Sequence, residues 1–344
     1  EEGAFELVNP NAPLEGSGFI IIGMGKLGAR ELNYSSDIDL IVLYDTERIK
    51  TSEPDRLQNN FVRLTRNLVK LISERTAEGY VFRTDLRLRP DPGATPLTLS
   101  RLAAETYYES LGQNWERAAM IKARPVAGDI EAGQNFLKHL VPFVWRRNLD
   151  FAAIQDVHSI KRQINAHSVS PTRGTRGHNI KLGHGGIREI EFFAQTQQLI
   201  WGGREPQLRS PDTITALSDL AKLAHCDETA IQELTDAYVF LRQVEHRLQM
   251  INDEQSQILP TTDENFQRLA IFLGFKDADT FNTSIEQHTQ CVQHHYAQLF
   301  ADAPNLDANG GGNLVFTGRD ADPETLQTLR ELGFCAPELA NMII

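Results

Sequence analysis

The stretch GMGKLGARELNYSSDIDLIVLYD, residues 23–45, decides how the rest of this chain is interpreted. Its second half, residues 38–45, is rich in β-branched residues and alternates at its start, which predicts a strand. Side chains on a strand alternate between faces, so Asp37 and Asp39 point the same way, with Cα atoms roughly 6.5–7 Å apart. Two carboxylates placed so close repel each other, and a bound divalent cation removes that repulsion. The pair therefore predicts a metal site, and a solvated strand face with charged residues is the alternative.

The glycines ahead of this pair spell G-x-G-x-x-G after the apolar run at residues 18–23, which is the pattern of a dinucleotide-binding turn. A Rossmann unit needs a full crossover helix before its second strand, and residues 29–36 allow only about two helical turns. We therefore expect a tight turn and a short helix, whose backbone amides bind a nucleotide phosphate. The candidate phosphate-binding residues here are Gly25, Lys26, Ser35 and Ser36.

Further along, a helix is expected between about residues 54 and 78, and a third strand over residues 80–90. The apolar positions of that helix are Leu57, Phe61, Leu64, Leu68 and Leu71. In the strand, Asp85, Arg87 and Arg89 share one face. If the two strands pair, Asp85 completes a site of three carboxylates, and the two arginines reach phosphate oxygens, which guanidinium groups bind bidentately.

Strand patterns fade after about residue 128, and amphipathic helices follow. The clearest helix covers residues 231–251, with an apolar seam at Leu234, Ala237, Leu241, Val244, Leu248 and Ile251. We expect a catalytic domain at 1–128, a helical bundle domain at 129–304, and a linker with the start of a further unit at 305–344. The opening lacks Met and the end resembles a linker, so we expect a piece of a longer protein.

Composition limits the function classes. The formal charge is 34 − 46 = −12, which disfavours a general nucleic-acid binder. Three scattered cysteines make no disulfide framework and indicate a reducing cytoplasm. No apolar run is long enough for a membrane span. A cytoplasmic protein without nucleic-acid or membrane partners is expected.

Two other clusters of residues are less specific indications of a functional site. Lys181 precedes a Gly-rich turn and a helix that carries Glu189 and Glu191 in its first turns, so these three residues are candidates for a place near the active cleft. A capped helix packed between domains is the alternative. His288, Cys291, His294 and His295 lie at helical spacing, but their arc is too wide to bind one zinc ion easily, so a helix surface is favoured.

The opening stretch resembles the motif of glutamine synthetase adenylyltransferases, which belong to the polymerase-β-like nucleotidyltransferase superfamily. The resemblance continues through FRTDLRLRPDPGATPLTLS (82–100) and YYESLGQNWERAAMIKARPVAGD (107–129). It persists in the helical part at residues 179–210 and 244–260. This implies an α+β fold, in which a nucleotidyltransferase domain with a small mixed sheet is followed by an all-α helical bundle.

The family's enzymes have two such catalytic halves. One attaches AMP to a tyrosine of glutamine synthetase, and the other removes it by phosphorolysis, giving ADP. The sequence of residues 112–124 resembles that of the N-terminal, adenylyl-removing half. The alternatives are the adenylylating half and a non-catalytic module that senses nucleotide or docks glutamine synthetase.

The resemblance also implies site residues and partners. Asp37 and Asp39 match the family's metal ligands, and Asp85 falls where the superfamily places its third carboxylate. Mg²⁺ or Mn²⁺ is the implied cofactor. The implied partners are AMP-modified glutamine synthetase, nucleotide, phosphate and the PII signal protein. We hypothesise that the three aspartates hold the ions that bind the AMP phosphate, while Lys26, Arg87 and Arg89 neutralise charge on the phosphoryl oxygens.

Overall fold

The computed structural model describes residues 9, 11–51, 53–147, 175–251 and 253–299. Two compact units are distinguished. The first comprises residues 1–148, 194–235 and 244–256, and the second comprises 149–193, 236–243 and 257–344. The predicted segment at 305–344 lies outside the described residues.

The first unit is built on a five-stranded mixed sheet with the order β3-β2-β1-β5, in which β4 also pairs with β2. The strands are β1 (Phe19–Gly23), β2 (Asp37–Tyr44), β3 (Arg83–Asp85), β4 (Leu99–Ser100) and β5 (Arg124–Gly128). β1 runs antiparallel to both β2 and β5, whereas β2 runs parallel to β3 and β4. The antiparallel β1–β2 pair rules out a Rossmann unit, whose first two strands are parallel. The α+β class with a small mixed sheet is therefore confirmed.

Strand alternation sorts the central residues to two faces of the sheet. Ile20, Ile22, Ile41 and Leu43 pack in one buried cluster with side chains of the helices between residues 101 and 144. Ile21, Leu40 and Val42 pack on the other side with Leu68 and Ile72.

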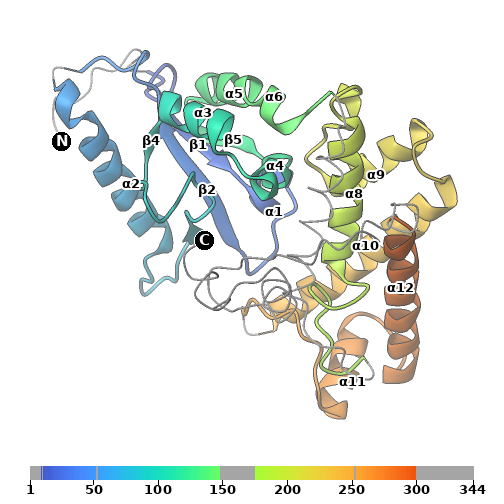
Figure 1. Ribbon diagram of the computed structural model, residues 1–344. Helices are drawn as coiled ribbons and strands as arrows, with labels where there is room; N and C mark the ends of the chain where they lie inside the picture. The colour runs from blue at the N-terminus through green and yellow to red at the C-terminus, as the bar shows by residue number, and fades with distance from the viewer. Residues whose placement is uncertain (1–8, 10, 52, 148–174, 252, 300–344) are drawn as a thin grey trace, which may run out of the picture. The chain divides into compact units, whose positions relative to one another are not determined.

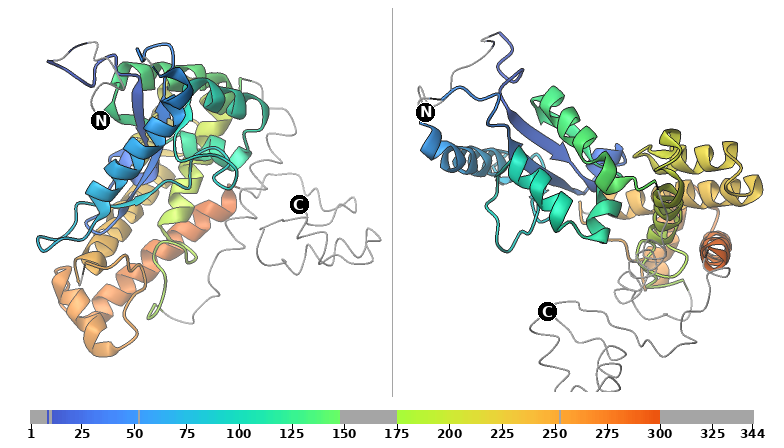
Figure 2. Two further views of the ribbon diagram at one scale, coloured as in Figure 1. Left: turned by 90° about the vertical axis from the view of Figure 1, so that its left-hand side faces the viewer. Right: turned by 45° about the horizontal axis from the view of Figure 1, so that its top comes forward.

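The helices of this unit lie accordingly. α2 (Leu57–Ser73) lies on one face of the sheet, and α3 (Arg101–Ser110), α4 (Asn114–Met120), α5 (Ile130–His139) and α6 (Val141–Val144) lie on the other (Figures 1 and 2). α1 (Gly25–Ala29) fills the β1–β2 connection, and the 3-10 helix η1 (Pro54–Arg56) precedes α2.

The predicted domain boundary at residue 128 does not coincide with the edge of the first unit. α5 begins at Ile130, yet its Phe136 is fully buried in the cluster that contains Ile20 and Ile41. The 3-10 helix η2 (Pro206–Leu208) and α9 (Thr213–Lys222) also belong to this unit. The burial of Phe136 therefore shows that α5 packs against the sheet, although the strand patterns in the sequence fade before it.

Past Gly128, the described residues form helices and a single isolated bridge between Asn179 and Ile258. The long helices are α8 (Ile187–Trp201), α10 (Glu228–Met250), α11 (Asp263–Phe272) and α12 (Ala278–Gln298). The predicted seam of α10 is buried from Leu234 to Leu248, whereas Ile251 lies past the helix end and is exposed. Among the described helices, none is both long and apolar enough to cross a membrane.

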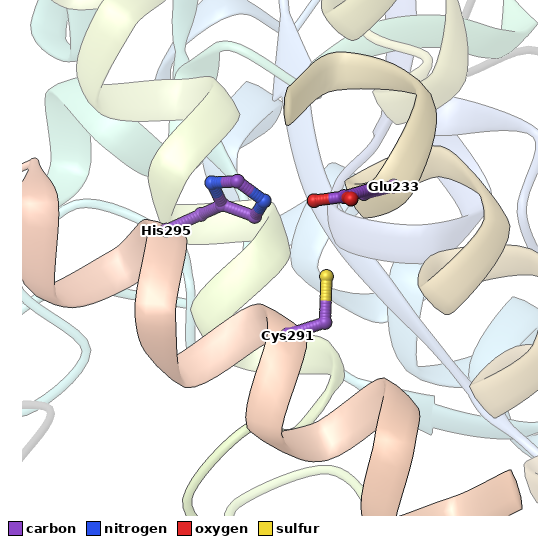
Figure 3. Close-up of side chains that lie close together, drawn as sticks. All are labelled: Glu233, Cys291 and His295. Atoms are coloured by element: carbon purple, nitrogen blue, oxygen red, sulfur yellow. The ribbon is translucent and has the colours of Figure 1, made fainter. Parts of the chain in front are cut away.

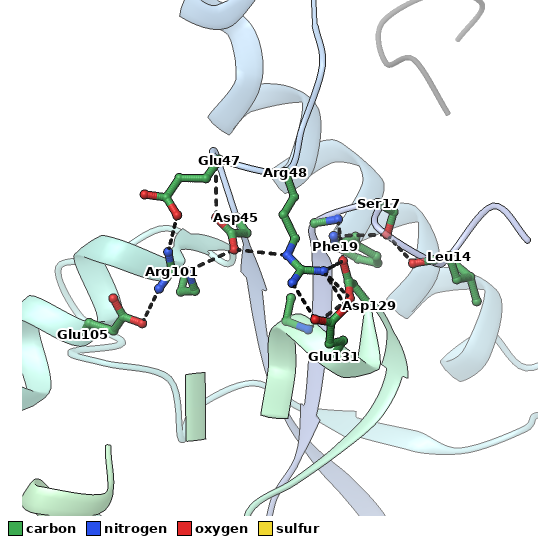
Figure 4. Close-up of polar contacts among 12 residues, drawn as sticks. Leu14, Ser17, Phe19, Asp45, Glu47, Arg48, Arg101, Glu105, Asp129 and Glu131 are labelled. Carbon is green, nitrogen blue, oxygen red and sulfur yellow. Dashed lines mark hydrogen bonds and ion pairs between the residues drawn. The ribbon is translucent and has the colours of Figure 1, made fainter. Parts of the chain in front are cut away.

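An ionic network fastens the end of the sheet that lies away from the paired aspartates (Figure 4). Arg101 contacts Asp45, which follows β2, and Arg48 contacts Asp129, which caps the N-terminus of α5. Asp129 also accepts a hydrogen bond from the backbone amide of Gly18, at 3.2 Å. Because these side chains are mostly buried and each guanidinium has several carboxylate partners, the network fixes β1, β2 and α5 to one another.

Candidate metal and phosphate site

The three predicted carboxylates converge at the start of β2. In the parallel pair of β2 and β3, Asp37 lies opposite Arg83 and Asp39 lies opposite Asp85. One carboxylate oxygen from each of Asp37, Asp39 and Asp85 lies within 4.8 Å of the others. All three side chains are partly buried. Clustered carboxylate oxygens are the hard ligands that Mg²⁺ and Mn²⁺ take, so the donor set fits such an ion.

Arg87 is bound to Asp85 rather than aligned beside it on a strand. Its Nε and Nη2 donate to Asp85 Oδ2 at 2.8 and 2.5 Å, while the guanidinium stays largely exposed. These bonds hold the pKa of the Asp85 carboxyl below its ordinary value. In this arrangement the guanidinium is the counterion of the carboxylate cluster.

The expected strand over residues 80–90 is wrong beyond Asp85, because β3 covers only Arg83–Asp85. The Asp85 side chain accepts a hydrogen bond from the backbone amide of Arg87 at 2.8 Å, which turns the chain away from the sheet. Arg89 then binds the carbonyl oxygens of Leu86, Pro92, Thr95 and Pro96. Its guanidinium holds the loop after β3 together, which differs from the expected contact with phosphate.

Lys26 also differs from expectation. Its Nζ lies 2.9 and 3.0 Å from the two carboxylate oxygens of Glu245, a fully buried residue of α10. This ion pair fixes the Gly-rich turn to a helix more than 200 residues away in sequence. We therefore attribute to Lys26 a role in positioning the turn.

The glycines of the turn have packing roles. Gly25 has φ +51°, and a Cβ there would lie 2.9 Å from Asp39 Oδ2. At Gly28 an added Cβ would overlap the carbonyl oxygen of Lys122. The backbone thus approaches Asp39 at Gly25 and the Lys122 carbonyl at Gly28 closely only because these two positions lack side chains.

The two serines lie just before the first aspartate. Ser35 is buried and its Oγ accepts a hydrogen bond from Arg83 at 2.7 Å. Arg83 also donates to the Tyr80 hydroxyl at 2.6 Å, which in turn donates to Asp253 at 3.0 Å. Ser36 lines a cavity of about 370 Å³ with Tyr34, Tyr80 and Asp253 among its walls. The serine turn is therefore held rigidly beside a cavity next to the carboxylates.

Sequence reasoning missed the contribution of the segment after α10. Gln255 donates a hydrogen bond from Nε2 to Asp37 Oδ1 at 3.2 Å, and Asp253 accepts one from the Tyr80 hydroxyl. No local pattern in the sequence places residues 253–255 against residue 37. Their only signal was the resemblance, which included residues 244–260.

The other predicted residues belong to the second unit. Glu189 accepts a hydrogen bond from the Gly185 amide at 2.9 Å, and the Lys181 amide is bound by the Asn179 side chain at 3.0 Å. Glu191 lies on α8 and is partly buried. These bonds form a capped helix start, and a place of the three residues near an active cleft stays a prediction.

The histidine- and cysteine-containing helix is α12. Cys291 and His295 project from the same side of this helix, one turn apart (Figure 3). Two donors on one helix are fewer than the four protein ligands of a structural zinc site. The predicted helix surface holds for His294, which is exposed, but is wrong for His295, which is buried.

Comparison with known proteins adds to this geometry. Residues 6–139 match the family model described as glutamate-ammonia ligase adenylyltransferase, and residues 158–300 match the model described as GlnD PII-uridylyltransferase. Bifunctional glutamine synthetase adenylyltransferase/adenylyl-removing enzymes from Rhizobium meliloti and Agrobacterium fabrum are each 55% identical over 344 residues. A relative of the same description from Brucella suis is 54% identical over 332 residues.

The alignments cover 100% of this chain in the first two relatives and 96% in the third, but only 35%, 35% and 34% of the relatives themselves. The chain thus spans about a third of the length of the curated relatives it matches. The matched region in the first two relatives spans both the sheet-containing part and the helical part of this chain. The chain belongs to the family of bifunctional glutamine synthetase adenylyltransferases/adenylyl-removing enzymes.

Proposed function

We propose that this chain removes AMP from an adenylylated tyrosine of glutamine synthetase by metal-dependent phosphorolysis, which yields ADP. The observation that carries the proposal is the convergence of Asp37, Asp39 and Asp85 within 4.8 Å. The names of the relatives support glutamine synthetase as the protein substrate. The finer fold that we propose is a polymerase-β-like nucleotidyltransferase domain followed by an all-α bundle, in a cytoplasmic enzyme.

In the proposed reaction, an oxygen of inorganic phosphate attacks the phosphorus of the tyrosyl-AMP diester. The bond between that phosphorus and the tyrosine oxygen breaks, and the phenolate takes up a proton from water. Asp37, Asp39 and Asp85 would hold Mg²⁺ or Mn²⁺, which supplies Lewis-acid neutralisation of the phosphoryl oxygens when bound. Gln255 orients Asp37 through its hydrogen bond, and Arg83 fixes the serine turn.

Arg87 is the residue of the phosphate-binding set that retains an exposed guanidinium. Asp85 would hold the ion with the same carboxylate oxygens that now accept hydrogen bonds from Arg87. Arg87 would then be available to bind phosphoryl oxygens, which guanidinium groups do bidentately. Regulation by nucleotide and by the PII signal protein stays part of the proposal without assigned residues.

The test is to incubate the chain with AMP-modified glutamine synthetase, phosphate and Mg²⁺, and to measure ADP release. We expect ADP with the wild type and a loss of at least about a hundredfold with Asp39→Asn, because that change removes a carboxylate ligand. Circular dichroism should show an unchanged fold. Near wild-type release from Asp39→Asn would contradict the proposed role of the cluster.

The same preparation distinguishes the alternatives. The adenylylating half would consume ATP, modify unmodified glutamine synthetase and release pyrophosphate. A non-catalytic module would bind nucleotide or glutamine synthetase in calorimetry and turn over neither. The proposal requires ADP from the modified protein to be the dominant product.

A further inference from the structure

The helix α2 has an outer face that differs from the rest of this acidic chain. Phe61 and Thr65 are buried, and Leu68 and Ile72 pack against the sheet. Two other leucines of α2 point outward, since Leu64 is 41% and Leu71 is 76% exposed. Two exposed leucines two turns apart on one helix form an apolar strip that nothing in the fold of this unit requires.

Basic residues flank this strip. Residues 57–75 contain Arg63, Arg66, Lys70 and Arg75 against Glu74 alone, a balance of 4 − 1 = +3 in a chain of net charge −12. The Lys70–Glu74 pair is exposed and 3.8 Å apart, so it neutralises little. Within the described ranges, Arg66 and Arg75 form no ion pair with a carboxylate. The strip is thus both apolar and cationic.

The strip leads directly to the carboxylate cluster. The backbone amides of Val81 and Phe82 both donate to the carbonyl oxygen of Ile72 at 3.1 Å, which folds residues 75–82 onto the end of α2. The same segment supplies Arg75, Tyr80, Val81 and Phe82 to the wall of the 370 Å³ cavity. The lining also includes Ser36, the neighbour of Asp37. A chain that crossed α2 and entered the cavity would therefore arrive beside the metal site.

The rim of this cavity is also open and aromatic. Tyr34 is 70% and Val81 is 64% exposed, and both line the cavity. The ring of Tyr80 lies beneath the guanidinium groups of Arg75 and Arg83, each 5.5 Å from the ring centroid. Because that ring already has cationic partners, the cavity suits a polypeptide with carboxylate and apolar side chains better than a stacked base.

We propose that the outer face of α2, formed by Leu64, Arg66, Lys70, Leu71 and Arg75, is the docking face for the protein that carries the AMP group. The surface that it fits is acidic with apolar residues between the charges, and the segment with the modified tyrosine enters the adjacent cavity. The proposal rests on the proposed function and deepens it by assigning where the protein substrate binds. The helix spans about 25 Å at 1.5 Å per residue, which exceeds a nucleotide and matches part of a protein interface.

The test reverses the charge of this face and of a matched surface. The test variant is Arg66→Glu/Lys70→Glu. The control is Lys222→Glu/Arg268→Glu, which changes the net charge equally at exposed positions of α9 and α11. We expect the KM for AMP-modified glutamine synthetase to rise about tenfold or more at low salt in the test variant, and about twofold at most in the control. The kcat and the KM for phosphate should stay near wild type.

A second variant tests the apolar part. Leu71→Ser removes an exposed leucine, so folding should be unaffected, and binding to the modified protein should weaken about threefold or more. Cleavage of a small tyrosyl-AMP diester, which cannot reach α2 and the cavity together, should be unchanged in all variants.

Direct binding separates failure of the docking proposal from failure of the proposed function. Interferometry with immobilised AMP-modified glutamine synthetase needs no catalysis, so it reports on docking even if no ADP forms. Equal affinities for the wild type and Arg66→Glu/Lys70→Glu would overturn the docking face. The docking face would also be overturned if Arg66→Glu/Lys70→Glu weakened binding to duplex RNA but left binding to glutamine synthetase unchanged.

Discussion

Gly28 is the most tightly constrained residue of the Gly-rich turn. Its Cα lies against the backbone carbonyl of Lys122, and an added Cβ would overlap that oxygen. Gly28→Ala should therefore destabilise the fold by about 2–3 kcal/mol or more, since backbone on both sides prevents relaxation. Urea unfolding measures this difference.

The control for that change is Gly93→Ala. The nearest atom to a Cβ at Gly93 is Asp91 Oδ1 at 3.7 Å, an ordinary contact. We expect a change within about 0.5 kcal/mol there. Equal stabilities of both variants would show that the close approach of Gly28 to Lys122 is not maintained.

At the residue scale, the sequence predicted carboxylates better than cations. Strand alternation suffices to place Asp37 and Asp39 on one face, and parallel pairing brings Asp85 to them. The cations depended on more distant information. Arg89 binds carbonyl oxygens of the loop because β3 ends at Asp85. Lys26 pairs with Glu245, which lies 219 positions away in the sequence. Local patterns contain no signal for either contact.

At the scale of the helix, α4 offers a test of a buried acid. Glu116 is 2% exposed and accepts a hydrogen bond from the Gln113 amide at 2.7 Å, which completes a capping box. Burial raises the pKa of this carboxyl above its ordinary value of 4.5. Between these two pKa values the folded protein binds more protons than the unfolded chain, so this group makes stability fall as the pH rises.

Replacing Glu116 with a residue that cannot titrate tests this pH dependence. Gln at this position keeps the capping hydrogen bond but cannot ionise. The stability of Glu116→Gln relative to wild type should therefore improve as the pH rises from 4.5 to 8, in urea unfolding at fixed ionic strength. Glu228→Gln, in the exposed first turn of α10, controls for the loss of one charge. A relative stability of Glu116→Gln that does not change with pH would contradict the effect of burial.

The helix α2 shows where periodicity stops being informative. Its apolar residues recur every three or four residues and correctly predicted a helix, but two of them, Leu64 and Leu71, are exposed. Phe61, Thr65, Leu68 and Ile72 form the buried side instead. On the buried side, Thr65 accepts a hydrogen bond from the Thr98 hydroxyl at 2.7 Å, and this contact is not visible in the sequence.

At the scale of the whole molecule, a metal ion that binds only the folded state should stabilise all of it. With Mg²⁺ or Mn²⁺ at 100 times its dissociation constant, the gain is about 2.7 kcal/mol. Calorimetric scans should show a melting temperature that rises with metal concentration for the wild type. Asp39→Asn should show no rise, because the cluster of three carboxylates is incomplete.

Buffer with EDTA and without added Mg²⁺ or Mn²⁺ provides the baseline for both proteins. Without metal, Asp39→Asn should be at least as stable as wild type, since it removes a negative charge from a cluster of three. A parallel metal response of the two proteins would place the ion elsewhere.

At this scale, prediction from the sequence succeeded where alternation or helical period within one short segment was enough. Short apolar runs predicted individual strands, and the family resemblance implied the small mixed sheet, whereas the boundary at residue 128 did not agree with the compact units. The return of residues 194–235 and 244–256 to the first unit depends on contacts between distant segments. Alternation and helical period carry no information about such contacts.

The parallel pairing of β2 with β3 also sets an order of events during protein synthesis. Asp39 leaves the ribosome 85 − 39 = 46 residues before Asp85. At about 5–20 residues per second, the first two acids wait for roughly 2–9 s before their partner strand emerges. β1 and β2 can form a hairpin in that interval, but the crossover through α2 must exist before the third acid arrives. A nascent chain should therefore acquire its cation affinity abruptly, after translation has passed β3.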